Sequence, residues 1–307
     1  MIYTVTLSPA LDYLLWLDRF EEGGLNRAGR TSFRAGGKGI NVSVVLSRLG
    51  LPSVCLGFAA GFTGRELLRL LSSEGIDHDF ISVDDGCTRI NVKIKSETET
   101  EINADGPKIT EGDLEKLHRK AEKLTSRDVL ILSGKPPKSV PENIYLSLLS
   151  AVRGKAVRTV VDASGGYLLA ALDEKPYLIK PNKAELEEIC GKELPSSGQI
   201  ASAACDLRKK GAQNVLVSLG AEGAILAADD GHVYTCGIPE GKLIDSTGAG
   251  DSMTAGFIAK ALTGSAKRDC LGYAVACGSA SAYSYDLLDA AGLEKVWQRM
   301  PEPETLI

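Results

Sequence analysis

The chain alternates between short apolar segments and amphipathic helical segments over most of its length, and this rhythm limits the possible folds more than any other feature. Strands that are connected through helices pair in parallel, and helices then cover both faces of their sheet. We therefore expect an α/β fold with a central, mainly parallel β-sheet flanked by helices. The expected strands are 2–7, 128–133, 158–162, 177–180 and 214–218, and the expected helices are 113–123, 141–152, 183–189, 199–210, 249–262, 266–285 and 289–299.

Three further segments, at about 12–20, 27–35 and 87–104, do not follow this rhythm, because they are short, mixed in polarity and flanked by turns. Residues 90–95 alternate strictly between apolar and polar side chains, which is the period of a half-exposed strand. These segments predict a small β-sheet that stands off the main body as a lid. Since the sequence has no internal repeat and no low-complexity linker, we expect residues 1–307 to form a single domain that includes this lid.

Composition excludes several classes of function. The net charge is −5 and no long basic run is present, so we do not expect nucleic acid as a partner. The seven cysteines include no CxxC pair and the three histidines are scattered, which argues against a disulfide framework or a zinc site. Neither a signal peptide nor a stretch of about 18 apolar residues is found, so we expect a cytoplasmic protein without a membrane partner.

The strongest local signal is Asp-Ser-Thr-Gly-Ala-Gly-Asp at residues 245–251, directly before an apolar helix. The small residues Gly248, Ala249 and Gly250 let backbone N–H groups converge at the positive end of the helix, which makes an anion site. Asp251 can then accept the proton of a hydroxyl that attacks a bound phosphoryl group, with Thr247 on the nucleotide side. The alternative is an ordinary helix start with Asp in its first turn.

A second glycine-rich segment, Ala-Gly-Gly-Lys-Gly-Ile-Asn, occupies residues 35–41. Gly37 allows close approach of the backbone to a ligand, and Lys38 and Asn41 supply a charge and an amide for substrate binding. A turn that leads into a helix is the alternative. No Gly-Lys pair in the chain is followed by Ser or Thr, and neither Gly-x-Gly continues to a third glycine, so P-loop and Rossmann sites are not predicted.

Asn182 and Glu185 follow a predicted strand that ends at Pro181. The two side chains lie within one helical turn and can share a magnesium ion through water, although helix capping alone also explains them. Ser218 follows the next predicted strand and begins a tight turn suited to a nucleotide, or equally to a hairpin. The residues of this turn assigned to nucleotide binding are Ser218, Gly220, Glu222 and Gly223.

Three basic residues complete the predicted site. A single lysine or arginine is most often a surface residue in an ion pair. Convergence of Arg89, Lys38 and Lys138 would instead make a pocket for a sugar phosphate. A guanidinium group such as that of Arg89 can bind a phosphate through two parallel hydrogen bonds.

In these motifs the sequence resembles the ribokinase-like (PfkB) carbohydrate kinases, and within them the 1-phosphofructokinase and tagatose-6-phosphate kinase group. The resemblance runs from the first strand to the last helix, with the motifs in the family's order. They are VTLSPALDY, GGKGIN, TRINVKIK, KPNKAEL, VSLGAEG and DSTGAGDS.

The resemblance implies an ATP- and Mg²⁺-dependent kinase that phosphorylates a small sugar phosphate. It implies that Asp251 is the catalytic base, that Asp12 binds sugar hydroxyls, and that the protein is a homodimer joined through the lid. Where 1-phosphofructokinases usually have Ser-Leu-Pro-Pro-Gly, this chain has Lys-Pro-Pro-Lys-Ser, and Lys138 falls where tagatose-6-phosphate kinases tend to have lysine. The motif TRINVKIK leans the other way, toward fructose 1-phosphate. We expect fructose 1-phosphate as the substrate and fructose 1,6-bisphosphate as the product, with tagatose 6-phosphate as the alternative. A non-catalytic sugar-phosphate sensor would be expected to lack the base, Asp251, or the loop at 245–250 that makes the anion site, which we call the anion loop. Both are present.

Overall fold

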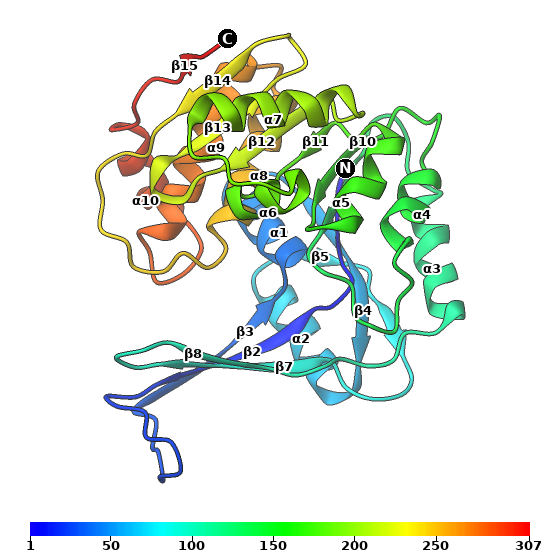
Figure 1. Ribbon diagram of the computed structural model, residues 1–307. Coiled ribbons are helices and arrows are strands. Elements are labelled where there is room, and N and C mark those ends of the chain that lie inside the picture. Colours follow the sequence, from blue (N-terminus) through cyan, green and yellow to red (C-terminus); the bar gives the residue numbers. More distant parts are fainter.

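The computed structural model describes residues 1–307, with a central sheet of eleven strands and a separate sheet of four strands (Figure 1). The central strand order is β15-β14-β13-β12-β11-β10-β9-β1-β4-β5, and β6 pairs with β4. Neighbours from β5 to β12 are parallel, which confirms the expected mainly parallel sheet. The strands are β1 (Ile2–Thr6), β4 (Ser53–Ala60), β5 (Asp77–His78), β6 (Ile81–Val83), β9 (Val129–Ser133), β10 (Arg158–Asp162), β11 (Leu178–Ile179), β12 (Asn214–Ser218), β13 (Ala224–Ala227), β14 (Val233–Cys236) and β15 (Glu304–Thr305).

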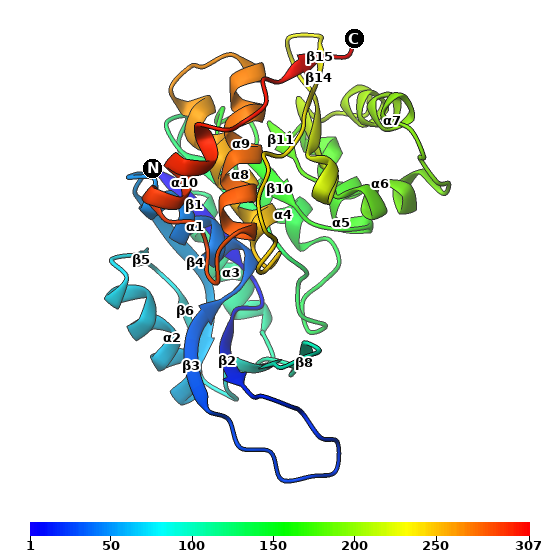
Figure 2. The ribbon, with the colours of Figure 1, turned by 90° about the vertical axis from the view of Figure 1, so that its left-hand side faces the viewer.

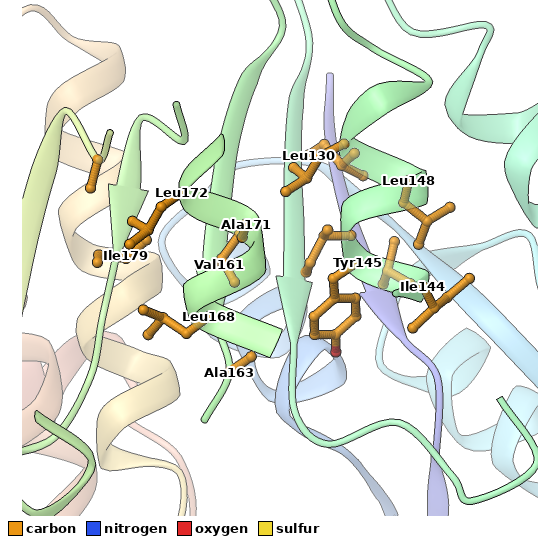
Figure 3. Close-up of a cluster of buried hydrophobic side chains, with 14 of the residues drawn as sticks. Leu130, Ile144, Tyr145, Leu148, Val161, Ala163, Leu168, Ala171, Leu172 and Ile179 are labelled. Carbon is orange, nitrogen blue, oxygen red and sulfur yellow. The ribbon is translucent and has the colours of Figure 1, made fainter. Parts of the chain in front are cut away.

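Helices cover both faces of this sheet, because successive side chains of a buried strand point to opposite faces. On β9, Leu130 and Leu132 join the core formed with α3 to α7, whereas Val129 and Ile131 join the core formed with α1 and α8 to α10. Figure 3 shows part of the first core, where α4 and α5 pack on β9 and β10. The helices are α1 (Lys38–Arg48), α2 (Gly61–Ser73), α3 (Glu111–Ala121), α4 (Ile144–Ser150), α5 (Gly166–Ala171), α6 (Lys183–Cys190), α7 (Ser197–Lys209), α8 (Ala249–Leu262), α9 (Lys267–Ala282) and α10 (Ala290–Trp297).

The small sheet has the order β3-β2-β7-β8 and lies apart from the central sheet (Figures 1 and 2). Its central pair, β2 and β7, is parallel, and both outer pairs are antiparallel. The third expected segment contains two strands rather than one, and the chain between β2 and β3 is a projecting loop without regular structure. The strands are β2 (Ala10–Trp16), β3 (Arg30–Gly36), β7 (Arg89–Lys95) and β8 (Thr100–Asn103).

The edge of the central sheet beyond β12 was not predicted from the sequence. The chain turns back through a short 3-10 helix, Gly220–Glu222, and β13 pairs antiparallel with β12. The hairpin alternative for this turn is therefore correct, and β14 and β15 continue the antiparallel edge. None of the helices combines the length and the apolar character that crossing a bilayer requires.

The register of the parallel strands brings their carboxyl ends to one edge. Thr6 at the end of β1 pairs with Ser133 at the end of β9, and Ser133 pairs with Asp162 at the end of β10. Ligands of open α/β sheets bind outside this edge. The polar residues that end these strands are therefore close to one another before any side chain is considered.

Candidate active site

A cavity of about 1070 Å³ lies between the carboxyl edge of the central sheet and the small sheet. It is large enough for two small ligands, since pockets for single drug-sized ligands measure roughly 300–1,000 Å³. Every residue expected in the site lines this cavity, except Lys138 and Glu222. The expected residues that line it are Asp12, Gly37, Lys38, Asn41, Arg89, Asn182, Glu185, Ser218, Gly220, Gly223, Thr247, Gly248, Ala249, Gly250 and Asp251.

The loop before α8 has the geometry that its sequence predicts. Gly248 is the N-cap of α8 and has a left-handed backbone, with φ of 76°. A Cβ atom at this position would lie 2.4 Å from Leu287 Cδ2, so only glycine fits. The helix then begins at Ala249, and Asp251 lies in its first turn with only 5% of its surface exposed. The small residues 248–250 and the buried Asp251 therefore line the same cavity, and the N–H of Ala249 donates to the carbonyl of Ser246 at 3.2 Å.

The Asp251 carboxylate is held by the amide of Asn41, whose Nδ2 donates to Oδ2 at 2.7 Å. Burial and the negative charge of Asp162 raise the pKa of Asp251 to about 6, against the opposing effects of Lys38 and of the Asn41 hydrogen bond. A carboxylate with this pKa is mostly ionised at neutral pH and is a better proton acceptor than an ordinary aspartate. Asn41, expected to bind the substrate, lines the cavity and also contacts Asp251.

A second buried aspartate, Asp162, lies between two lysines. Lys38 Nζ is 3.1 Å from Oδ1 and Lys180 Nζ is 3.3 Å from Oδ2. Burial opposes ionisation of Asp162, but the two ammonium groups lower its pKa below the usual value. In return, Asp162 raises the pKa of Lys38. This charge cluster was missed at the sequence level, although both Asp162 and Lys180 stand where a parallel strand ends.

The small sheet lines the cavity with alternate residues of β7. Asn91 Nδ2 donates to Asp12 Oδ1 at 3.0 Å, and Lys93 Nζ lies 3.6 Å from the other carboxylate oxygen. Gly36 makes room for this carboxylate, because a Cβ atom there would lie 2.6 Å from it. Burial raises the pKa of Asp12. Two buried polar atoms, Arg89 Nε and Asn91 Oδ1, have no hydrogen-bond partner within the protein.

On the opposite wall, Asn182 and Glu185 form a capping box at the start of α6. Glu185 N donates to Asn182 Oδ1 at 2.9 Å, and Asn182 N donates to Glu185 Oε2 at 2.8 Å. The capping interpretation is therefore correct, and it leaves both side chains on the cavity wall. No group of three or more His, Cys, Asp or Glu side chains forms a metal cage. A single carboxylate fits Mg²⁺, which keeps several water molecules and is completed by substrate phosphates.

The structure does not bring Lys138 or Glu222 into the cavity. Lys138 follows two consecutive prolines in a surface turn, its side chain is 91% exposed, and its ammonium lies 3.7 Å from Asp105. Glu222 ends the 3-10 helix of the β12–β13 hairpin and is exposed. The neighbours of Glu222 in its motif, Ser218, Gly220 and Gly223, do line the cavity, whereas no residue from 133 to 140 lines it.

Comparison with known proteins gives matches along nearly the whole chain. The family model described as pfkB family carbohydrate kinase matches residues 6–288. The chain is 40% identical to the 1-phosphofructokinase of Bacillus subtilis (strain 168) over 98% of both proteins. It is 36% identical to the D-tagatose-1-phosphate kinase of Bacillus licheniformis, over 96% of this chain and 97% of the relative. The crystal structure of phosphofructokinase-2 from Escherichia coli in complex with substrates and products matches with a TM-score of 0.92 at 29% identity, covering 97% of this chain and 98% of that chain.

Proposed function

Because the chain belongs to the pfkB family of carbohydrate kinases, we propose that it transfers the γ-phosphoryl group of ATP to fructose 1-phosphate, giving fructose 1,6-bisphosphate and ADP. The enzyme is a phosphotransferase that acts on a sugar hydroxyl. One observation carries the assignment of its site. The buried Asp251 and the small residues 248–250 before it line the same cavity as Asp12 and Arg89 of the small sheet.

The small sheet supplies the groups for the sugar phosphate. Arg89 and Lys93 carry the positive charge that a phosphate requires, and the unpartnered Nε of Arg89 is a donor without an internal acceptor. The Asp12 carboxylate, which accepts from Asn91 Nδ2 on the cavity wall, is the acceptor for ring hydroxyls. This arrangement holds the sugar by both its phosphate and its hydroxyls, and leaves the free hydroxymethyl group to point toward Asp251.

Phosphoryl transfer then needs one proton acceptor and one anion site. Asp251 accepts the proton of the sugar hydroxyl as its oxygen forms a bond to the γ-phosphorus, and the bond from that phosphorus to the β–γ bridging oxygen breaks. ADP leaves with the electron pair of the broken bond. The N–H groups of Gly248 and Gly250 stabilise the charge on the transferring group, whereas the N–H of Ala249 already donates to the carbonyl of Ser246 at 3.2 Å. Mg²⁺, which we place near Glu185 and the nucleotide phosphates, supplies positive charge to the ATP oxygens when bound.

Tagatose 1-phosphate is the second candidate substrate, because the relative from Bacillus licheniformis named for it is 36% identical along almost the whole chain. Tagatose and fructose differ only in the configuration of one ring carbon. Discrimination therefore depends on a few hydrogen bonds to ring hydroxyls, for which Asp12 and Asn91 are the groups in the cavity.

A panel of acceptors tests the proposal. The purified enzyme is assayed for ADP release with fructose 1-phosphate, tagatose 1-phosphate, tagatose 6-phosphate, fructose 6-phosphate and ribose, with Mg²⁺ and ATP in excess. We expect the highest kcat/KM with fructose 1-phosphate. If another acceptor gives a higher kcat/KM, that acceptor is the substrate and the assignment of fructose 1-phosphate is wrong. If the protein binds a sugar phosphate but releases no ADP with any acceptor in the panel, it is a sensor and not a kinase.

We also propose that the enzyme works in the cytoplasm, where ATP and sugar phosphates are found, as a homodimer joined through the small sheets. Phe33 and Ile102 support the dimer, since they are 47% and 57% exposed on this sheet. Phe33 stacks on Tyr13 with ring centroids 4.4 Å apart, which makes a rigid apolar surface. Sedimentation equilibrium measures the mass directly, and a monomer at micromolar concentration would refute the dimer.

A further inference from the structure

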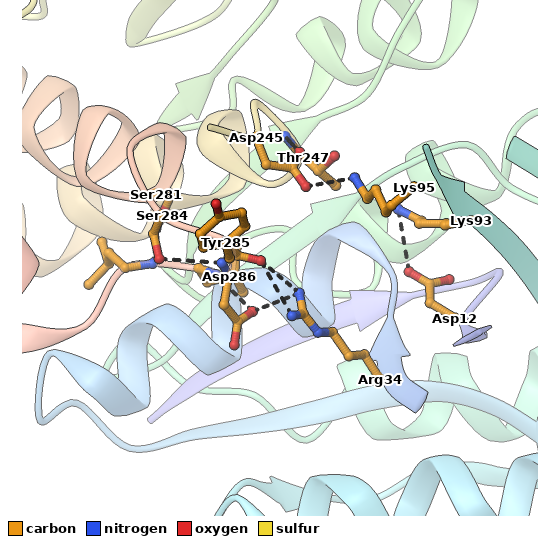
Figure 4. Close-up of polar contacts among 12 residues, drawn as sticks. Asp12, Arg34, Lys93, Lys95, Asp245, Thr247, Ser281, Ser284, Tyr285 and Asp286 are labelled. Carbon is orange, nitrogen blue, oxygen red and sulfur yellow. Dashed lines mark hydrogen bonds and ion pairs between the residues drawn. The ribbon is translucent and has the colours of Figure 1, made fainter. Parts of the chain in front are cut away.

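Strand β7 of the small sheet presents four consecutive alternate residues to the cavity, namely Arg89, Asn91, Lys93 and Lys95. The first three belong to the proposed sugar-phosphate site. Lys95, the last residue of the strand, reaches the loop before α8 instead, where its Nζ lies 2.9 Å from Asp245 Oδ2 (Figure 4). The same strand therefore carries the proposed sugar-phosphate site at one end and contacts the loop before α8 at the other.

Asp245 connects this contact to the conformation of the loop. Its second carboxylate oxygen, Oδ1, accepts the N–H of Thr247 at 2.9 Å, and its own N–H donates to the carbonyl of Ala282 at 3.2 Å. Thr247 is followed directly by Gly248, the N-cap of α8. A single carboxylate thus shapes the turn before the anion site with one oxygen and holds Lys95 with the other.

The ion pair between Lys95 and Asp245 is shielded from solvent enough to hold the two segments together. The side chains of Lys95 and Asp245 are 19% and 20% exposed, whereas exposed ion pairs at the surface contribute little. The Glu99 carboxylate contacts the same ammonium from the β7–β8 turn. Arg34 also links the small sheet to the body, through Asp286 and the carbonyl of Tyr285 in the loop after α9, but it makes no contact with Asp245 (Figure 4).

We propose that Lys95 is a positioning residue for phosphoryl transfer, which it supports by fixing the anion loop relative to the strand that binds the sugar. Lys95 does not touch the reacting atoms. Its pair with Asp245 sets the distance between the acceptor hydroxyl, carried by the small sheet, and the phosphoryl group, carried by the loop. Because transfer requires the attacking oxygen in line at close range, a displacement of about 1 Å can cost roughly 100-fold in rate. The inference rests on the proposed function.

The test replaces Lys95 by methionine, which keeps the length of the side chain and removes its charge. With the best acceptor from the panel, we expect Lys95→Met to lower kcat about tenfold, since the loss falls on the transfer step. KM for the sugar phosphate should change by no more than about twofold, because the residues that bind it remain. More ATP should be hydrolysed per sugar phosphorylated, as water competes with a misplaced hydroxyl. Lys95→Arg should restore most of kcat.

Two control variants separate this role from a general structural one. Glu99→Gln removes the other partner of Lys95 and leaves Asp245 in place, so kcat should stay close to the unmodified value. Lys209→Met removes a remote, exposed ion pair with Asp206, so both its kcat and its Tm should stay close to those of the unmodified enzyme. In a double-mutant cycle, Lys95→Met combined with Asp245→Asn should be no slower than Asp245→Asn alone.

Three outcomes would overturn the inference. These are an unchanged kcat in Lys95→Met, a change confined to KM and Tm, or kcat losses that multiply in the double mutant. A failure of the proposed function is distinguishable, because the unmodified enzyme would then phosphorylate none of the acceptors in the panel.

Discussion

Replacement of the buried Asp251 by asparagine should lower activity and raise stability at the same time. Asparagine has the same shape, and its side-chain oxygen can still accept from Asn41 Nδ2, which lies 2.7 Å from Asp251 Oδ2. The base is lost, however, and general base catalysis contributes roughly 10²–10⁴-fold to turnover. We expect kcat to fall by this factor, with little change in KM for either substrate.

The gain in stability follows from the pKa of Asp251, which rises from 3.8 to about 6 through burial and through repulsion by Asp162. A raised carboxyl pKa means that the folded protein holds a proton which the unfolded chain releases between about pH 4 and pH 6. Stability therefore falls as pH rises through this window, and the ionised carboxylate destabilises the fold above it. The shift corresponds to a cost on the order of 3 kcal/mol at neutral pH, which Asp251→Asn removes.

Two measurements check this reasoning. Steady-state kinetics with the best acceptor gives kcat, and calorimetry gives Tm at pH 7.5 and at pH 4.5. We expect Tm of Asp251→Asn to exceed that of the unmodified enzyme by about 5 °C at pH 7.5, and by much less at pH 4.5. Near-normal turnover would refute the assignment of the base. A Tm that drops equally at both pH values would refute the electrostatic account of the site.

Three further results are expected. In the unmodified enzyme, kcat/KM should rise with pH through an apparent pKa near 6, and Asn41→Ala should move this limb to higher pH because it removes a hydrogen bond that stabilises the Asp251 carboxylate. Arg89→Met should raise KM for the sugar phosphate roughly 10- to 100-fold, whereas Lys138→Met, whose side chain is 91% exposed, should leave KM unchanged. Glu185→Gln should keep Tm, because glutamine also completes a capping box, but should raise the Mg²⁺ concentration for half-maximal activity roughly 10- to 100-fold.

The parallel part of the fold could be predicted from the sequence because each of its signals is local. The strand at Arg158–Asp162 and the helix at Ala249–Leu262 have the bounds that periodicity gave. The antiparallel edge could not be predicted from the sequence, because Ala224–Ala227 is a short apolar run that would suit a parallel strand equally well. Only its pairing with β12 makes it antiparallel, and pairing is not a local property.

The expected site residues line the cavity where a motif constrains the backbone, whereas the positions of long, flexible side chains were harder to predict. Gly248 and Gly37 lie in conformations with φ of 76° and 134°, which few other residues adopt, so the motif fixes their place. Lys138 and Lys38 are different, because a lysine head group can reach many partners. The first extends into solvent, and the second pairs with Asp162 at a distance of 124 residues in the sequence.

The two buried aspartates show why one can be the base and the other cannot. Both lie at the same edge, with 1% of Asp162 and 5% of Asp251 exposed, so burial alone does not distinguish them. Asp162 has an ammonium group on each oxygen, from Lys38 and Lys180, which lowers its pKa. Asp251 has a neutral amide on one oxygen, and the charge on Asp162 raises its pKa. Paired carboxyl groups whose pKa values are pushed apart take different roles. Asp162, which stays charged, holds Lys38 and Lys180 in place, and its charge makes Asp251 a stronger proton acceptor.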